Sequence, residues 1–177
     1  MSDVLDAIKS RRSIRKYKSD PIPKDAIDQI IEAGLYAASG RGYQNTIMIH
    51  VSDKSMRDKI MEMNRKVGGW AEGFDPFYGA PEMIIVLAKV EPGYTNGRYD
   101  GSLVMGNLML AAHALGIGSC WINRAREEFE SEEGRAILKK LGIDSEYEGV
   151  GHCALGYIDG EIPDAAPRKE NRVYYVN

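Results

Sequence analysis

Apolar residues recur at helical spacing in two segments near the start of the chain. The first lies within residues 4–8, and a longer series runs from Ile27 to Ala38 after the segment PIPKD. Pro23 suits the first turn of the second helix, and the glycines within residues 39–42 are typical of its end. The pattern therefore predicts two helices that flank a short polar stretch.

Short runs of β-branched and other apolar residues predict two strands in the middle of the chain. They are TIMIHV at residues 46–51 and EMIIVLAKV at residues 82–90, each bounded by turn residues. Between them, residues 55–67 show helical spacing and residues 68–81 form a loop. That loop is too long and too aromatic for a plain connection, so we expect it to cover part of the molecule.

The most apolar stretch of the chain, residues 100–115, is apolar on nearly every helical face and ends on glycines. We expect a helix that is buried at the centre of the fold or in a dimer interface. The remaining elements are a strand at 119–123, a helix at 131–141, a strand at 149–156 and a tail at 170–177 that could add an edge strand. This order indicates an α+β or mixed α/β class in one domain over residues 1–177.

Charge and cysteine content narrow the partners and the compartment. The chain has 23 Lys plus Arg and 26 Asp plus Glu, a formal charge of -3, so its overall field would not attract nucleic acid. The two cysteines, Cys120 and Cys153, form no CxxC pair, which argues against a disulfide framework. The start lacks the apolar core of a signal peptide, and no apolar run reaches membrane-spanning length. We therefore expect a cytoplasmic protein with no membrane partner.

The common catalytic templates do not occur. GxxxxGK[ST], HExxH and GxSxG are missing, and His50, His113 and His152 lack the paired spacing of a zinc site. We therefore expect structural histidines and no metal site. GVGHCA at residues 149–154 formally matches GxGxxA, but no helix pattern follows it, so we interpret it as a strand.

Adjacent carboxylates occur twice, at Glu127 with Glu128 and at Glu132 with Glu133. Their surroundings are polar and typical of helix starts, so we expect solvated side chains and not a glycosidase pair. No side chain is nominated as a nucleophile, general acid or general base. A protein whose chemistry comes from a bound cofactor needs few reactive side chains, and this sequence fits that case.

The segment KSRRSIRKYKSD, residues 9–20, concentrates positive charge in an otherwise slightly acidic chain. If it is extended, alternation places Arg11, Ser13 and Arg15 on one side and the intervening side chains on the other. Two guanidinium groups with a hydroxyl between them suit a phosphate monoester. The alternative is a solvated turn after a short helix.

Several segments, in this order, resemble the FMN-dependent nitroreductase family over nearly the whole chain. They are RRSIRKY before PIPKDAIDQIIEAGLYAAS, then SGRGYQN, FYGAP, DGSLVMGNLMLAAHALGIGSCWI and LGYIDGEIPDAAPRKE. The central helix together with GIGSCWI is the most specific of them. The resemblance implies an α+β fold with a central, mostly antiparallel sheet flanked by helices, in an intertwined homodimer with FMN at the subunit interface.

The same resemblance implies a two-step reaction. NADH or NADPH reduces the flavin and leaves, and a small nitro, quinone or other unsaturated acceptor then takes the electrons. One alternative is a flavin reductase whose acceptor is free flavin, and another is a protein that binds or senses FMN without turnover. A nucleic-acid binder is disfavoured because the chain is acidic overall and its basic run lacks interleaved aromatic residues.

The resemblance also implies which positions contact the cofactor. The phosphate and the pyrimidine side of the ring would be held by Arg11, Arg12, Ser13 and Arg15, with Arg168 closing from the tail. The partner subunit would supply Ser39, Gly40 and Gln44. Asn64 would contact the ring or the ribityl chain. The strand lying against the isoalloxazine, with a backbone N–H near its hydride-accepting nitrogen, would be Trp121, Ile122 and Asn123.

Two departures from the family pattern affect the rim of the implied pocket. Gln44, Asn45 and Thr46 stand where the family commonly has Gln-Pro-Trp, and Gly42 stands where an Asn is frequent. Residues 88–100 are too few for the helical insertion that roofs the substrate site in longer members. The resemblance therefore assigns neither the acceptor nor a choice between NADH and NADPH.

Overall fold

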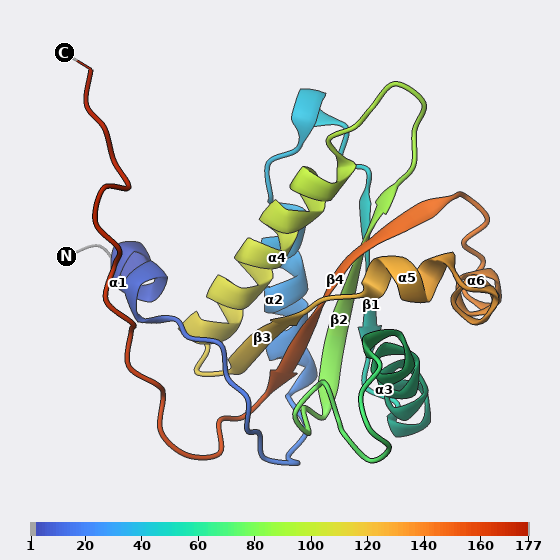
Figure 1. The fold of residues 1–177 in the computed structure, drawn as a ribbon, viewed down its shortest axis with the longest axis horizontal. Coiled ribbons are helices and arrows are strands. Elements are labelled where there is room, and N and C mark those ends of the chain that lie inside the picture. Colours follow the sequence, from blue (N-terminus) through green and yellow to red (C-terminus); the bar gives the residue numbers. More distant parts are fainter. Residues whose placement is uncertain (1–2, 177) are drawn as a thin grey trace.

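The computed structural model describes residues 3–176 (Figure 1). Its centre is an antiparallel sheet in the order β1-β2-β4-β3. The strands are β1 (Thr46–Val51), β2 (Glu82–Lys89), β3 (Gly118–Ile122) and β4 (Tyr147–Gly156). The helices are α1 (Asp3–Ser10), α2 (Lys24–Leu35), α3 (Lys54–Gly68), α4 (Gly97–Ala114), α5 (Ala125–Glu130) and α6 (Glu132–Lys140), with a 3-10 turn η1 (Gly40–Gly42).

Strand β2 is the buried middle of a three-layer arrangement. Met83, Ile85 and Leu87 belong to one apolar cluster, and Ile84 and Val86 belong to the other. Successive side chains of a strand point to opposite faces, so an unbroken apolar run fits a strand that is covered on both sides. This explains why the sequence of β2 shows no polar alternation.

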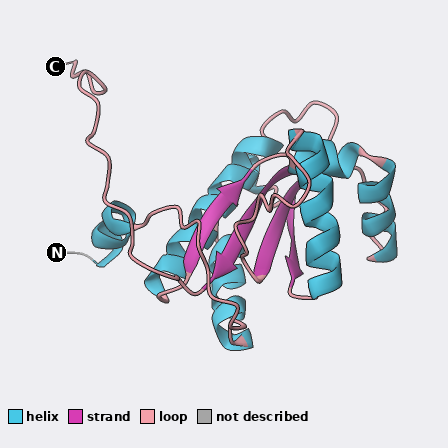
Figure 2. Cartoon of the chain, turned by 60° about the horizontal axis from the view of Figure 1, so that its bottom comes forward, coloured by secondary structure: helices cyan, strands magenta, loops and turns pink. Residues whose placement is uncertain are grey.

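Helices cover both faces of the sheet, as Figures 1 and 2 show. α2 and α4 pack together on one face, where the apolar cluster includes Ile30 and Leu108. α3, α5 and α6 contribute to the cluster on the other face, which includes Ile60 and Phe129. α5 is a helix that the apolar pattern did not predict. The predicted α+β class with an antiparallel sheet flanked by helices is confirmed.

Helix α4 is buried on one side only within a single chain. It begins at Gly97, three residues before the predicted start, and its sheet-facing side includes Met105 and Leu108, both without exposed area. On its outer side Tyr99 is 70% exposed and Leu103 is 50% exposed. A single chain therefore does not bury nearly every face of α4. Of the two predicted positions for this helix, the centre of the fold and a dimer interface, the dimer interface stays open.

The basic segment after α1 lies along the edge of β3. Ser13 forms a parallel bridge with Ser119, and the backbone N–H of Ile14 donates to the Ser119 carbonyl at 2.9 Å. Further along, Tyr17 forms an antiparallel bridge with Ile158. The basic segment is therefore an extended border of the sheet, as its alternation argument required, and not a free turn.

The predicted edge strand in the tail is wrong for the residues that the structure describes. Residues 161–176 are exposed and form no strand. Figure 1 shows that they pass α1 and run away from the sheet. The edge of β3 is already bordered by the basic segment. The last residue of the predicted strand, position 177, lies outside the described residues.

Within residues 3–176, no helix combines the length and the apolar character that crossing a membrane would need.

Candidate functional site

Arg11 and Ser119 place unsatisfied polar atoms at the border between the basic segment and β3. One terminal nitrogen of Arg11, Nη1, and the Ser119 hydroxyl are buried and have no hydrogen-bond partner among residues 3–176. The indole N–H of Trp121 also has no partner among the described residues, but it lies on the β4 side, against Gly151. Leaving a buried donor unsatisfied costs roughly 1–3 kcal/mol. The two groups of Arg11 and Ser119 on neighbouring segments indicate a place where a ligand rich in hydrogen-bonding groups would bind.

Arg12 donates to carbonyl groups of the chain, although its Nε is buried and has no hydrogen-bond partner among residues 3–176. Its Nη1 donates to the Lys9 carbonyl at 2.7 Å and to the Arg11 carbonyl at 2.8 Å. A cation that binds the last carbonyls of a helix stabilises the helix end. Arg12 thus caps α1, and its predicted contact with the cofactor stays a prediction.

Arg15 reaches the loop that the sequence predicted as a cover. Its guanidinium carbon lies 5.8 Å from the ring centre of Tyr78, a cation–π distance. Tyr78 has a φ of 56°, which is the left-handed region that bulky residues rarely adopt. Surrounding contacts must therefore hold this loop firmly.

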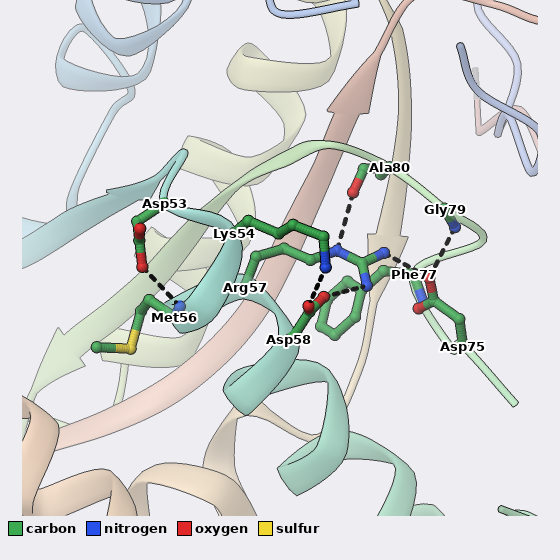
Figure 3. Close-up of polar contacts among 9 residues, drawn as sticks. All are labelled: Asp53, Lys54, Met56, Arg57, Asp58, Asp75, Phe77, Gly79 and Ala80. Atoms are coloured by element: carbon green, nitrogen blue, oxygen red, sulfur yellow. Dashed lines mark hydrogen bonds and ion pairs between the residues drawn. The ribbon is translucent and has the colours of Figure 1, made fainter. Parts of the chain in front are cut away.

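Those contacts centre on Arg57 and Asp75 (Figure 3). Arg57 is buried, and it donates through Nε to the Ala80 carbonyl at 3.0 Å and through Nη2 to the Asp75 carboxylate. Asp75 also accepts from the backbone N–H groups of Phe77 at 2.8 Å and Gly79 at 2.9 Å. The loop is consequently a fixed support that inserts Phe77 into the core and brings Tyr78 under Arg15.

The end of β3 is held from its buried side. Asn64 has no exposed area, and its Nδ2 donates to the Asn123 carbonyl at 2.8 Å and to the Glu128 carboxylate. His152 is equally buried, with Nδ1 3.3 Å from the Ile122 carbonyl oxygen and Nε2 3.0 Å from Glu128 Oε2. Two consecutive carbonyls at the end of this strand are therefore tied to one polar network.

Glu128 corrects an expectation from the sequence. It was predicted to be solvated with its neighbour Glu127, but its exposure is 1%. The cause is α5, where Ala125, Glu128 and Phe129 form the buried face. A carboxylate three residues after one apolar position and next to another is the pattern that could have indicated this burial. Glu132 and Glu133 are exposed, as predicted.

The residue after Asn123 turns the chain sharply from the strand into α5. Arg124 has a φ of 82°, and its guanidinium carbon lies 4.3 Å from the ring centre of Trp70. That distance is short for a cation–π contact. The indole thus holds the side chain of a residue whose backbone is in an unfavourable conformation.

The segment with Ser39, Gly40 and Gln44 lies at the other end of α4. Gly40 N–H donates to Asp100 Oδ1 at 2.9 Å in the first turn of α4, whereas His113 in its last turn lies 2.7 Å from the Ser10 hydroxyl. A rise of 1.5 Å per residue separates these two turns by about 20 Å. Within one chain, these three predicted residues therefore do not meet the basic segment.

Among residues 3–176, Arg168 makes no hydrogen bond or ion pair with the basic segment. It is exposed in the tail, and its Nε donates to the Ala166 carbonyl at 3.1 Å. The structure thus brings together Arg11, Arg12, Ser13, Arg15, Trp121, Ile122, Asn123 and Asn64, and it does not bring Ser39, Gly40, Gln44 or Arg168 to them.

The thiols and histidines near these segments offer no obvious reactive group. Burial raises the pKa of Cys153 to about 12, and burial also raises the pKa of Cys120, so neither is a thiolate near neutral pH. Burial, with the charges of Arg11 and Arg12, lowers the pKa of His113. In the described part of the chain, no three His, Cys, Asp or Glu side chains are grouped as metal ligands would be.

Comparison with known proteins gives consistent matches. A model described as the nitroreductase family matches residues 8–157. A protein of Methanothermobacter thermautotrophicus named "Putative NADH dehydrogenase/NAD(P)H nitroreductase" is 37% identical over 124 residues, which is 67% of this chain and 60% of that protein. A protein of the same name from Archaeoglobus fulgidus is 31% identical over 162 residues, 89% of this chain and 86% of its own length.

A solved structure extends the match to the whole fold. A nitroreductase with bound FMN from Bacteroides fragilis has a TM-score of 0.87 at 31% identity, with 100% of both chains covered.

Proposed function

The chain belongs to the nitroreductase family, and from this premise we propose that it is an FMN-dependent oxidoreductase. It would oxidise NADH or NADPH and reduce a small nitro, quinone or other unsaturated molecule. The observation that carries this proposal is the pair of unsatisfied buried groups at Arg11 and Ser119. They border the segment whose two arginines and serine suit a phosphate monoester.

The chemical groups that these residues offer are of the kind that would bind FMN. Arg11 has a guanidinium nitrogen without a partner in the described chain, Ser13 lies beside β3, and Arg15 is exposed with its guanidinium over Tyr78. These groups would bind the phosphate and the pyrimidine side of the ring, while Trp121 and Asn123 would border the isoalloxazine. When bound, FMN supplies the electron-transfer chemistry, accepting a hydride from the nicotinamide and passing electrons to the second substrate.

The chain's own work is then binding and orientation. Arg12 fixes the end of α1 so that the basic segment leaves the helix in one direction. Tyr78 supports the Arg15 guanidinium from a loop that Arg57 anchors. Asn64 holds the Asn123 carbonyl and so fixes the end of β3. We assign no side chain as a general acid or base.

A second copy of the chain would complete the site. Ser39, Gly40 and Gln44 are about 20 Å from the basic segment along α4, so they reach it only from another subunit. Large apolar side chains that are exposed on α1, α4 and the tail are Val4, Leu5, Ile8, Tyr99, Leu103, Ile162, Val173, Tyr174, Tyr175 and Val176. Surfaces of this kind mark protein contacts. We propose a homodimer with FMN at its interface, in which Arg168 of the tail closes on the phosphate.

Two further assignments belong to the same proposal. We treat residues 1–177 as a single domain, because the two apolar clusters share one sheet. We place the protein in the cytoplasm, where two unpaired cysteines are ordinary.

The test begins with the colour of the purified protein. We expect a yellow protein that releases FMN on heating, and anaerobic NADH or NADPH should bleach it. Repeated recovery of the colour with a nitro compound or quinone supports the proposal, and recovery with free flavin alone favours the flavin-reductase alternative. Binding without bleaching indicates a sensing protein, and failure to take up added FMN overturns the proposal.

Single substitutions test the assigned phosphate contacts. Arg11→Ala and Arg15→Ala should each weaken FMN binding about tenfold or more, because charged hydrogen bonds are worth roughly 1.5–3 kcal/mol. Lys16→Ala is the matched control, since Lys16 is exposed and paired with Asp159 at 2.8 Å. Titration of the FMN-free variants measures the effect. Equal losses at all three positions would mean that the segment acts only as diffuse charge.

A further inference from the structure

Glu128 and His152 form a buried polar pair behind the end of β3. Glu128 is 1% exposed and His152 has no exposed area, although a glutamate is almost never fully buried unless it is paired. One lies in α5 and the other in β4, and their closest atoms are 3.0 Å apart. A polar pair this deeply buried needs nearly complete hydrogen bonding to be tolerated.

The hydrogen bonds of the pair converge on the strand end. Glu128 Oε1 accepts from Asn64 Nδ2, which also donates to the Asn123 carbonyl. His152 Nδ1 faces the Ile122 carbonyl, so its hydrogen is directed at that oxygen. His152 Nε2 lies 3.0 Å from Glu128 Oε2. Both carboxylate oxygens and both ring nitrogens are thereby used, which leaves little freedom to rotate.

We propose that Glu128 and His152 are positioning residues for the redox step. They fix the carbonyls of Ile122 and Asn123, and through them the backbone N–H groups that border the flavin. This inference rests on the proposed function, which places that strand end against the isoalloxazine.

Peptide geometry carries the effect from one side of the strand to the other. A peptide unit is planar and trans, so its C=O and N–H point in opposite directions. Holding the Ile122 carbonyl toward His152 directs the N–H of Asn123 away from the buried network. Holding the Asn123 carbonyl toward Asn64 does the same for the N–H of Arg124. A donor aimed in advance at a reacting group is worth more than one that must turn during the reaction.

A second Glu–His pair provides the matched control. Glu82 is 5% exposed, its Oε2 lies 2.7 Å from His50 Nε2, and its Oε1 accepts from the Ile22 N–H at 2.8 Å. Among residues 3–176, Glu82 makes no hydrogen bond to the end of β3. Glu82→Leu therefore removes a buried carboxylate of the same kind without touching the strand end.

The experiment compares Glu128→Leu with Glu82→Leu in the full chain. Leucine is close to glutamate in volume but has no polar atom, so Asn64 Nδ2 and His152 Nε2 lose their partner. In FMN-free protein, we expect faster hydrogen exchange at the amides of Asn123 and Arg124 in Glu128→Leu than in Glu82→Leu. In FMN-loaded protein, we expect anaerobic bleaching by NADH or NADPH to slow about tenfold only in Glu128→Leu, with a shifted flavin absorption band.

The outcomes separate this inference from the proposed function. Unchanged exchange and bleaching in Glu128→Leu, or changes that match Glu82→Leu at equal melting temperature, overturn the positioning role. If wild-type protein does not take up FMN, the proposed function fails, while the exchange comparison still tests whether the pair fixes the strand end. Should Glu128→Leu not fold, His152→Gln replaces it, and unchanged exchange at Asn123 in that variant overturns the inference.

Discussion

The two Glu–His pairs use the same chemical groups in two different surroundings. Glu82 pairs with His50 across β1 and β2, and His50 keeps 28% of its side chain exposed. Glu128 pairs with His152 where α5 covers β4, and neither side chain is exposed. Water can replace part of the first pair if a partner is lost, but it cannot reach the second without opening the fold.

The two pairs also fasten different parts of the chain. Glu82 receives the N–H of Ile22 and so ties the segment before α2 to β2. The Glu128 pair, with Asn64, ties the end of β3 to α3 and β4. The difference shows that a buried ion or hydrogen-bond pair in this fold is explained by what it holds in place, because burial alone would favour apolar side chains.

The largest expected difference between the pairs appears when the carboxylate is removed. Glu128→Ala leaves the donors of Asn64 and His152 buried without an acceptor, so we expect a loss of about 3–5 kcal/mol in the free energy of unfolding. Glu82→Ala leaves one partly exposed ring and one N–H, so we expect about 1–3 kcal/mol. Urea unfolding at neutral pH measures both. Equal losses would show that burial does not distinguish the pairs.

The next effect concerns the contact that brings α5 to β4. A Cβ at Gly149 would lie 2.1 Å from the Ala125 carbonyl oxygen, so the helix and strand would have to separate. We expect Gly149→Ala to cost about 2–3 kcal/mol and to weaken the contact between Glu128 and His152. The measurement is thermal unfolding together with the hydrogen exchange of Asn123.

Gly151→Ala is the control for this substitution in the same strand. Its Cβ would meet the Trp121 side chain at 2.6 Å and no backbone atom among its nearest contacts. A side chain can shift more easily than a helix backbone, so we expect a smaller loss than at Gly149. A larger loss at Gly151 would contradict the view that the α5–β4 contact is the tighter constraint.

The surroundings of Glu82 and His50 could be predicted from the sequence better than those of Glu128 and His152. Both strands around Glu82 have strong apolar patterns, and β1 and β2 were predicted close to their observed bounds. The basic segment was also predictable, because its alternation and charge are local properties. The family resemblance added the fold and the cofactor, which no local pattern supplies.

The surroundings of Glu128 depend on contacts that no local pattern records. α5 has only six residues and begins after Arg124 in a left-handed conformation, so it lacks the periodicity of a longer helix. His152 is 24 positions away and Asn64 is 64 positions away along the chain. Only the packed fold brings these groups together, which is why Glu128 was predicted to be solvated.

The smallest expected effect is a pH dependence of stability caused by Cys153. It sets the pH range in which the two Glu–His pairs can be compared. Cys153 follows His152 in β4, so its thiol belongs to the opposite face of the strand. Burial raises its pKa to about 12 from an ordinary value near 9. The thiol of the unfolded chain therefore ionises first, and the free energy of unfolding decreases as the pH rises from about 9 toward 12. This thiol contributes up to about 1.4 kcal/mol to the decrease for each pH unit, and Cys153→Ala should abolish that contribution. Urea unfolding at pH 8 and pH 10 measures the difference. Rapid labelling of this thiol in native protein at pH 8 would contradict the burial argument, because the thiolate would then be accessible on the reverse side of the strand that carries His152.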